Sequence, residues 1–201
     1  MRETIKQSIL IYLVLTLVTG VIYPLAITAV AQVAFPSQAN GSLIADKTTG
    51  KIVGSGLLGQ EFSDPKYFWG RLSATSPAYN AAASSGSNLG PLNPTLKKNV
   101  EERIRALDSD GISSGSIPVD LVTSSGSGLD PDISVSSALY QSKRIAKIRG
   151  LSENAVSELV SKEIQAKQFG CLGEARVNVL KLNIALDKTM HATEKTATSP
   201  E

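Results

Sequence analysis

The chain has 201 residues, of which 42% are hydrophobic and 19% are charged, and its formal net charge is only +2. This composition supplies enough apolar side chains for a packed core and argues against a wholly disordered chain. It shows neither the basic surplus typical of nucleic-acid binding nor an acidic surplus typical of metal buffering. The length suits one membrane anchor followed by one domain of ordinary size.

A long apolar run near the N-terminus predicts a transmembrane helix. No Asp, Glu, Lys or Arg occurs from Ser8 to Phe35. About 20 apolar residues in a helix cross a hydrocarbon core of roughly 30 Å, so this run is long enough. A cleaved signal peptide is the alternative, because Ala29-Val30-Ala31 offers a small-residue cleavage site. Signal peptides have hydrophobic regions of only about 7–15 residues, so we expect the segment to be retained.

The charges that flank the run predict its orientation. Arg2 and Lys6 precede it, and the next basic residue is Lys47. Because basic residues concentrate on the cytoplasmic side of a membrane, we predict a cytoplasmic N-terminus and an extracytoplasmic domain. The predicted organisation is a cytoplasmic N-terminus, a transmembrane helix, one mixed α+β domain and a disordered tail, at residues 1–8, 9–33, 36–188 and 189–201.

The predicted span also contains residues that exposure to lipid alone does not require. These are Thr16, Thr19, Gly20, Pro24 and Thr28. Small and hydroxyl side chains let helices approach closely and bond to one another, which favours packing on a partner helix. Gly and Pro are nevertheless common in transmembrane helices in general, so passive anchoring stays open as the alternative.

The first half of the domain is predicted to contain a short β-like run and one helix. The run lies within residues 51–60, and residues 79–94 have the composition of a loop. A helix is expected to start with Asn93 as its N-cap and Pro94 as its first residue. Gly111 is expected to end it. Its apolar face is formed by Leu96, Val100, Ile104 and Leu107.

The second half is predicted to be richer in helix. After a short strand at 118–123 and a tight loop at 124–131, we expect a helix from about Ser134 to Arg149, stopped by Gly150. A second helix, capped by Ser152, is expected next. A strand is predicted at 175–180, and residues 182–188 fit either a continued strand or a helical turn. The fold class is therefore α+β.

Sequence motifs for common chemistry are lacking. There is no P-loop and no cluster of Cys and His with zinc-ligand spacing. The lone Cys171 cannot form an internal disulfide, and the only histidine, His191, falls in the predicted tail, which argues against nucleophilic catalysis by either residue. A Ser–Lys dyad has no recognisable sequence signal. A membrane-anchored periplasmic hydrolase therefore stays as the alternative to a non-catalytic role.

Three loop-forming segments each allow two interpretations. Residues 84–90 and 124–131 are rich in Ser and Gly, and they predict either backbone N–H nests for an anion or ordinary turns, which are commoner. Residues 67–71, Tyr-Phe-Trp-Gly-Arg, predict either an interaction hot spot or a buried corner of the core with Arg71 in a salt bridge.

Seven segments occur in a characteristic order along the chain. They are residues 19–25 (Thr-Gly-Val-Ile-Tyr-Pro-Leu), 40–44 (Asn-Gly-Ser-Leu-Ile), 54–60, 67–71, 85–91 (Ser-Gly-Ser-Asn-Leu-Gly-Pro), 122–131 and 176–183. Together they resemble one protein family, the C subunit of the Kdp-type high-affinity potassium-transporting P-type ATPase of bacteria. The resemblance runs from about residue 5 to residue 188. Two positions depart from the family pattern, Leu72 where Pro is usual and Asp132 where His is usual.

The resemblance implies a non-catalytic, single-span accessory subunit in the bacterial plasma membrane. Its partners would be the lipid bilayer, a channel-like potassium-binding subunit, a P-type ATPase subunit and a small single-span subunit. The family is described as a catalytic chaperone that raises the affinity of the ATPase subunit for ATP. Because the domain is predicted to lie outside and ATP is inside, such an effect must be an allosteric coupling. ATP and potassium would act on the complex, with no cofactor or metal bound directly.

The span and the matched loops supply the candidate functional residues. Predicted partner contacts in the membrane are Thr16, Gly20, Tyr23 and Pro24. Predicted partner-binding or structural loop residues are Gln60, Tyr67, Phe68, Arg71, Ser87, Asn88, Ser127, Gly128 and Asp130. No catalytic residue is predicted.

Overall fold

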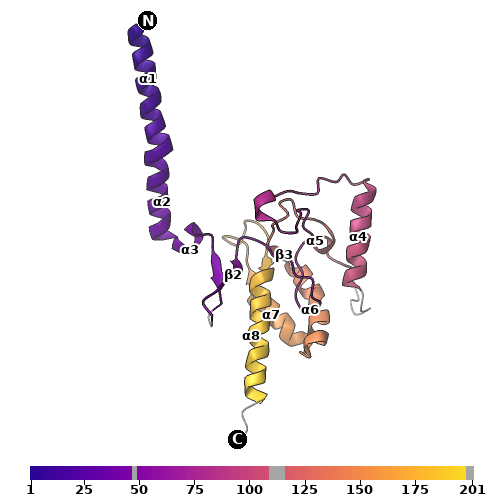
Figure 1. Ribbon diagram of the computed structural model, residues 1–201. Coiled ribbons are helices and arrows are strands. Elements are labelled where there is room, and N and C mark those ends of the chain that lie inside the picture. The colour runs from indigo at the N-terminus through magenta and orange to yellow at the C-terminus, as the bar shows by residue number, and fades with distance from the viewer. Residues whose placement is uncertain (47–48, 109–115, 198–201) are drawn as a thin grey trace. The chain divides into compact units, whose positions relative to one another are not determined.

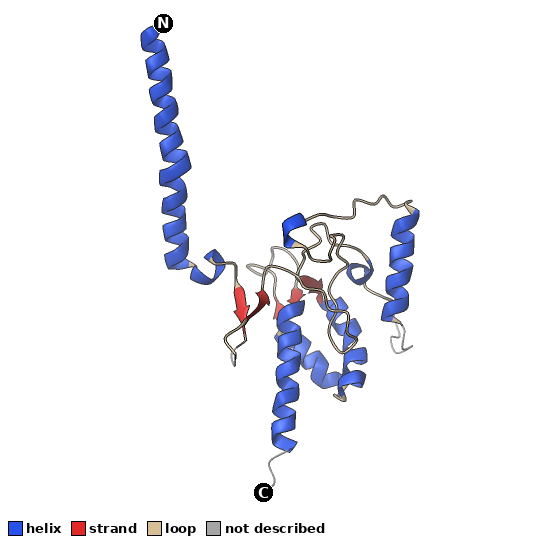
Figure 2. Ribbon diagram, in the orientation of Figure 1, coloured by secondary structure: helices blue, strands red, loops and turns tan. Residues whose placement is uncertain are grey.

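The computed structural model describes residues 1–46, 49–108 and 116–197, with side chains up to residue 189. The chain divides into two compact units, Met1–Ser55 and Gly56–Glu201, which are described separately. The first unit consists of a long helix and a hairpin, and the second combines helices and short strands (Figures 1 and 2). The predicted α+β class, with one N-terminal span and one mixed domain, is confirmed.

The N-terminal helix is continuous from Arg2 to Ala34 and is long and apolar enough to cross a membrane. It consists of α1 (Arg2–Leu17), a π-helical turn η1 (Val18–Ile22) and α2 (Tyr23–Ala34). At 1.5 Å per residue its 33 residues extend over about 50 Å, more than the roughly 30 Å of a hydrocarbon core.

The π turn ends two residues before Pro24, and the chemistry of proline explains its position. In a regular α-helix the carbonyl of Gly20 would point at the nitrogen of Pro24, which carries no hydrogen and whose ring occupies that space. The chain instead widens by one residue, and the Tyr23 N–H donates to the carbonyl of Val18, five residues earlier. The hydroxyl of Thr19 donates to the Leu15 carbonyl at 2.7 Å within the same stretch.

A short helix and a hairpin complete the first unit. The helix α3 (Pro36–Ala39) leads to the antiparallel strands β1 (Leu43–Ala45) and β2 (Ile52–Ser55), so the β-like run predicted within 51–60 is confirmed. The Ser55 hydroxyl donates to the Gly41 carbonyl at 2.7 Å and closes the open end of the hairpin.

A three-stranded antiparallel sheet lies within the second unit, in the order β3-β5-β4. Its strands are β3 (Asp132–Ser134), β4 (Ile164–Gln165) and β5 (Arg176–Asn178). Val177 of the central strand is fully buried and pairs with Ile133 on one side and Ile164 on the other. The sheet thus supplies branched apolar side chains to the centre of the domain.

Four helices of two or more turns surround the sheet and loops: α4 (Pro94–Leu107), α6 (Val135–Arg149), α7 (Glu153–Lys162) and α8 (Val179–Ala197). Their starts follow from local capping. The side chains of Asn93, Ser134 and Ser152 accept hydrogen bonds from the N–H groups of the first turns of α4, α6 and α7. Gly150 ends α6 with a left-handed φ of 65°. These predicted boundaries are confirmed.

The main core forms where α6, α7 and α8 pack on the sheet. Its buried members contact one another across these elements, and they are Phe68, Ile133, Ala138, Ile145, Ala146, Val156, Val160, Val177, Val179, Leu182 and Leu186. A smaller cluster of Trp69, Leu107, Leu121 and Val122 lies under α4. The two clusters meet at the neighbouring residues Phe68 and Trp69.

Three predicted elements differ from the structure. Residues 118–123 do not form a strand, because Val119–Val122 is the helical turn α5, which brings the Asp120 carboxylate to the Ser134 N–H at 2.8 Å. The predicted strand 175–180 ends at Asn178, whose side chain accepts from the Lys181 N–H at 3.1 Å and so starts a helix. That helix, α8, includes residues 182–188 and continues through Ala197, where the sequence predicted a disordered tail from residue 189.

The first long helix of the domain also ends earlier than predicted. Asp108 is the C-cap of α4, after Leu107. Gly111, the predicted terminator, lies outside the described residues.

Candidate functional site

The four candidate partner residues of the membrane helix surround the π turn. Thr16 precedes the turn, Gly20 lies within it, and Tyr23 and Pro24 follow it. All four are exposed, and Tyr23 is 63% exposed. A Cβ at Gly20 would meet no atom of the described chain within 4 Å. The helix therefore presents an uncovered surface with a flat position at Gly20, which suits close approach of a second helix.

The aromatic segment lies inside the domain and is held by two side-chain amides. Phe68 is completely buried and Trp69 is 6% exposed. The Asn183 side chain of α8 accepts from the Phe68 N–H at 2.9 Å and donates to the Phe68 carbonyl at 3.0 Å. The Gln141 side chain of α6 makes the same pair of bonds with Trp69, at 2.8 and 3.1 Å. The structure matches the core-corner interpretation of this segment.

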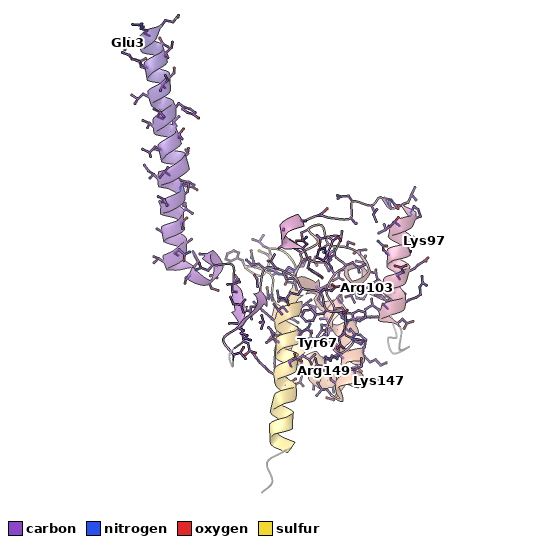
Figure 3. The ribbon with its side chains drawn as sticks, viewed as in Figure 1. Glu3, Tyr67, Lys97, Arg103, Lys147 and Arg149 are labelled. Atoms are coloured by element: carbon purple, nitrogen blue, oxygen red, sulfur yellow. The ribbon has the colours of Figure 1, made fainter. Side chains whose placement is uncertain are left out.

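Tyr67 and Arg149 continue this arrangement toward the surface (Figure 3). The Tyr67 hydroxyl donates to Asp187 at 3.0 Å, and Arg149 forms an ion pair with the same carboxylate at 2.8 Å. The Arg149 guanidinium lies 4.8 Å from the centre of the Tyr67 ring. Arg144 donates to the carbonyls of Pro65 and Tyr67. These contacts connect residues 65–69 to α6 and α8.

Arg71 connects three loops through hydrogen bonds of its guanidinium group and of its backbone carbonyl. Its Nη1 pairs with the Asp130 carboxylate at 3.1 Å, its Nη2 donates to the Ser124 carbonyl at 3.3 Å, and its own carbonyl accepts from the Tyr79 hydroxyl at 2.6 Å. The predicted salt bridge of Arg71 is thus present, with Asp130, another candidate residue, as its partner. Its Nε is buried without a described partner.

The two Ser/Gly loops pair with each other through their backbones. The Ser85 N–H and the Ser84 hydroxyl both donate to the Ser127 carbonyl at 3.0 Å. Within the second loop, Gly128 N–H donates to the Ser125 hydroxyl at 2.8 Å and Leu129 N–H to the Ser127 hydroxyl at 3.1 Å. These three N–H groups are occupied within the protein, as the turn interpretation of the loops expects.

The remaining loop candidates lie around these two paired loops, residues 84–90 and 124–131, which together with Arg71 are called the loop body. Gln60 follows Gly59, whose N–H donates to the Leu129 carbonyl at 2.8 Å. Asn88 has a positive φ of 49°, a conformation that Asn tolerates better than most residues. Ser87 lines a cleft of about 520 Å³ together with Ser124 and residues of α4. The structure therefore brings Arg71, Ser127, Gly128 and Asp130 together, places Phe68 in the core and leaves Tyr67 half-buried.

Tyr79 is a central residue of this body that sequence reasoning missed. It adopts a positive φ of 58°, and its ring and hydroxyl cover Gly59 and Gly70, where added Cβ atoms would collide with it. Burial raises the pKa of Tyr79 to about 12. In the sequence, the two glycines are the only sign of this contact. Gly59 and Gly70 lie 20 and 9 residues before Tyr79 along the chain.

Arg103 of α4 is a second residue that was missed. Its Nε donates to the Leu121 carbonyl at 3.0 Å and its Nη2 to the Gly70 carbonyl at 2.8 Å. Its guanidinium lies 4.8 Å from the centre of the Trp69 ring. Burial lowers the pKa of Arg103, opposed by the ionised form of Tyr79. It lies within the predicted helix, where no sequence pattern marks its distant partners.

The positions that depart from the resembled pattern are accommodated by local bonds. The Leu72 carbonyl accepts from the Ser125 N–H at 3.0 Å. Asp132 pairs with Arg176 at 2.8 Å and accepts from the Asn178 side chain at 3.2 Å. Cys171 is an exposed free thiol in a tight turn. Among the described side chains, no group of three His, Cys, Asp or Glu residues could hold a metal ion.

Comparison with known proteins assigns this arrangement to a family. The family model described as "K+-transporting ATPase, c chain" matches residues 5–188. A potassium-transporting ATPase KdpC subunit of Burkholderia orbicola is 56% identical over 194 residues, covering 96% of this chain and 100% of the relative. The KdpC subunit of Methylococcus capsulatus is also 56% identical, over 184 residues, covering 90% and 96%. The chain therefore belongs to the KdpC family, the c chain of the potassium-transporting ATPase.

Proposed function

We propose that this chain is a non-catalytic subunit that stabilises the assembly of a potassium-transporting ATPase and indirectly raises the affinity of its ATPase subunit for ATP. The observation that carries the proposal is the match over nearly the whole chain, span and domain together, to subunits named for this ATPase. The partners proposed are the channel-like potassium-binding subunit, the P-type ATPase subunit and the small single-span subunit.

The membrane helix is proposed as a docking element for a partner helix. Its widened π turn contains Gly20. Thr16 precedes this turn, and Tyr23 and Pro24 follow it. A helix whose only task is anchoring has no need of this interruption, whereas small residues and freed backbone carbonyls favour helix–helix contact.

The domain is proposed to lie outside the cytoplasm of a bacterial plasma membrane. Arg2 and Lys6 at the start of the helix support a cytoplasmic N-terminus. With that topology, the domain and the ATP pool are on opposite sides of the membrane. An effect on ATP affinity therefore requires that this subunit and ATP favour the same conformation of the assembly.

The loop chemistry supports a structural rather than a hydrolytic role for the Ser-rich segments. The hydroxyls of Ser73, Ser84, Ser125 and Ser127 take part in turn and loop bonds to backbone groups. A serine nucleophile instead needs a general base within hydrogen-bond reach. These four residues are proposed to keep the loop body rigid as a surface for partner subunits.

Co-purification from mild detergent tests the assembly role. The full chain, carrying an affinity tag after Glu201, is expected to retain the channel-like and ATPase subunits. Recovery of the chain alone, together with labelling by a serine-reactive probe that one Ser→Ala change abolishes, would instead favour the periplasmic hydrolase. A reporter fused after Glu201 tests the orientation, and we expect it to be active only on the extracytoplasmic side.

A further inference from the structure

Arg103 carries a charge that the described part of the protein does not neutralise. Two of its nitrogens donate to backbone carbonyls, of Leu121 and Gly70, which satisfies hydrogen bonds but supplies no negative charge. No described carboxylate lies within ion-pair distance of the guanidinium. Glu102, its neighbour on α4, lies 3.9 Å from Lys98 instead. Partly buried cations usually have an anionic partner, because removing a charge from water is costly.

The uncompensated guanidinium lies between two clefts of the same domain. One, of about 350 Å³, is lined by Glu61, Trp69, Tyr79 and Arg103 among others. The second, of about 520 Å³, is lined by Ser87, Asn99, Arg103 and Ser124 among others. Nη1 of Arg103 is accessible and makes no hydrogen bond to a described residue. The guanidinium is fixed by its other two nitrogens, so Nη1 is held in place for a ligand.

The second cleft also supplies neutral hydrogen-bond donors. The hydroxyls of Ser87 and Ser124 and the amide of Asn99 make no side-chain bonds to described residues. Oxyanions are recognised by this combination of a planar guanidinium with hydroxyl and amide donors. Each cleft is lined by one glutamate, Glu61 in the first and Glu102 in the second. Glu102 lies 3.9 Å from Lys98, whereas Glu61 has no ion pair with a described residue, so the second cleft is better suited to an anion.

We propose that the cleft formed by Ser87, Asn99, Arg103 and Ser124 binds a single oxyanion, a carboxylate or a phosphate group. The group comes either from a free anion or from an acidic side chain of a partner protein. The site follows from the geometry of the isolated chain and does not rest on the proposed subunit role.

The test uses Trp69 as a reporter. It is the only tryptophan of the chain, and its ring centre is 4.8 Å from the guanidinium of Arg103. The full chain in detergent, labelled with 5-fluorotryptophan, gives one ¹⁹F resonance. Inorganic phosphate and acetate, titrated against chloride at constant ionic strength, are expected to shift this resonance saturably. The absence of a saturable shift overturns the proposal.

A variant with a carboxylate built into the cleft tests the same site. Asn99 is four residues before Arg103 on α4, so the carboxylate of Asn99→Glu can pair with the guanidinium. We expect its resonance to start near the anion-bound position and its apparent phosphate affinity to fall by about tenfold or more. Lys97→Gln lowers the net charge equally on an exposed part of α4 and should titrate like the unmodified chain. Equal phosphate affinity in Asn99→Glu and Lys97→Gln contradicts the assignment.

The assembled complex distinguishes the two sources of the anion. The labelled chain is combined with unlabelled partner subunits and the titration is repeated. A resonance that still responds to phosphate supports a free anion as ligand. A resonance that is already shifted and no longer responds supports an acidic side chain of a partner. Failure of the complex to form would count against the proposed function and leaves the titration of the isolated chain as the test of the site.

Discussion

The side chain of Gln141 holds both backbone polar groups of Trp69, accepting from the N–H at 2.8 Å and donating to the carbonyl at 3.1 Å. The Asn183 side chain of α8 makes the same two hydrogen bonds with the backbone of Phe68. Two consecutive residues of an irregular segment are thus hydrogen-bonded as completely as they would be in a sheet, which lets the segment cross the core.

Replacement of Gln141 by Leu is expected to destabilise the domain strongly. The change replaces the amide by an apolar side chain of similar size and leaves the buried N–H and carbonyl of Trp69 without partners, at about 1–3 kcal/mol for each group. Denaturant unfolding of the full chain, followed by Trp69 fluorescence, measures the loss. Gln168→Leu, at an exposed position, is the control and should change the free energy of unfolding little. Similar stabilities of the two variants contradict the role assigned to Gln141.

Gly59→Ala is expected to destabilise the loop body by about 1–3 kcal/mol, as overpacking usually does. An added Cβ would lie 2.6 Å from the Asp130 carbonyl and would also collide with the Tyr79 ring. Gly90→Ala is the matched control, because its Cβ would meet nothing in the described chain within 4 Å. Thermal unfolding of both variants decides the matter. A Gly59→Ala chain as stable as the Gly90→Ala chain would show that Tyr79 does not pack as described.

Burial of Tyr79 predicts a loss of stability in alkaline solution. Its pKa is raised from the ordinary 10.0 to about 12, so the folded protein keeps this proton where the unfolded chain releases it. The contribution to the free energy of unfolding is fully present below about pH 10 and falls as the pH rises toward 12. The free energy of unfolding in urea is measured from pH 8 to pH 11 for the unmodified chain and for Tyr79→Phe. The difference between the two isolates the contribution of Tyr79. Parallel pH profiles of the two proteins would contradict the prediction.

Pro24→Ala is expected to remove the π turn. The alanine of this variant has an N–H that can bond to the Gly20 carbonyl, so the turn can return to regular α-helical spacing. This change of spacing by one residue rotates α1 relative to α2 by about 100°. The yield of partner subunits on co-purification should fall as a result. Pro36→Ala, at the first residue of α3 outside the span, is the control. A normal yield from the Pro24→Ala chain would argue against docking through this turn.

Local chemistry explains which parts of the fold could be predicted. The caps Asn93, Ser134 and Ser152 and the stop at Gly150 act within one turn of their own helices, so the sequence pattern reveals them. The strand predicted at 118–123 was wrong because Asp120 bonds to Ser134, and this tertiary contact favours a helical turn.

Long-range contacts explain what the sequence did not reveal in the site. Arg71 and Asp130 were both candidates, but their pairing spans 59 residues of chain. Gln141 and Asn183 were not singled out, because an amide on a helix has no sequence mark of its distant backbone partner. Arg103 was not among the candidate residues, although its side chain reaches the Gly70 carbonyl.

The ATPase activity of the complex at limiting ATP tests the central claim most directly. Partner subunits are assembled with and without the full chain, and the KM for ATP is measured in the presence of potassium. We predict a lower KM with the chain present, and no ATP hydrolysis by the chain alone. An unchanged KM in a complex shown to contain the chain would contradict the proposed coupling.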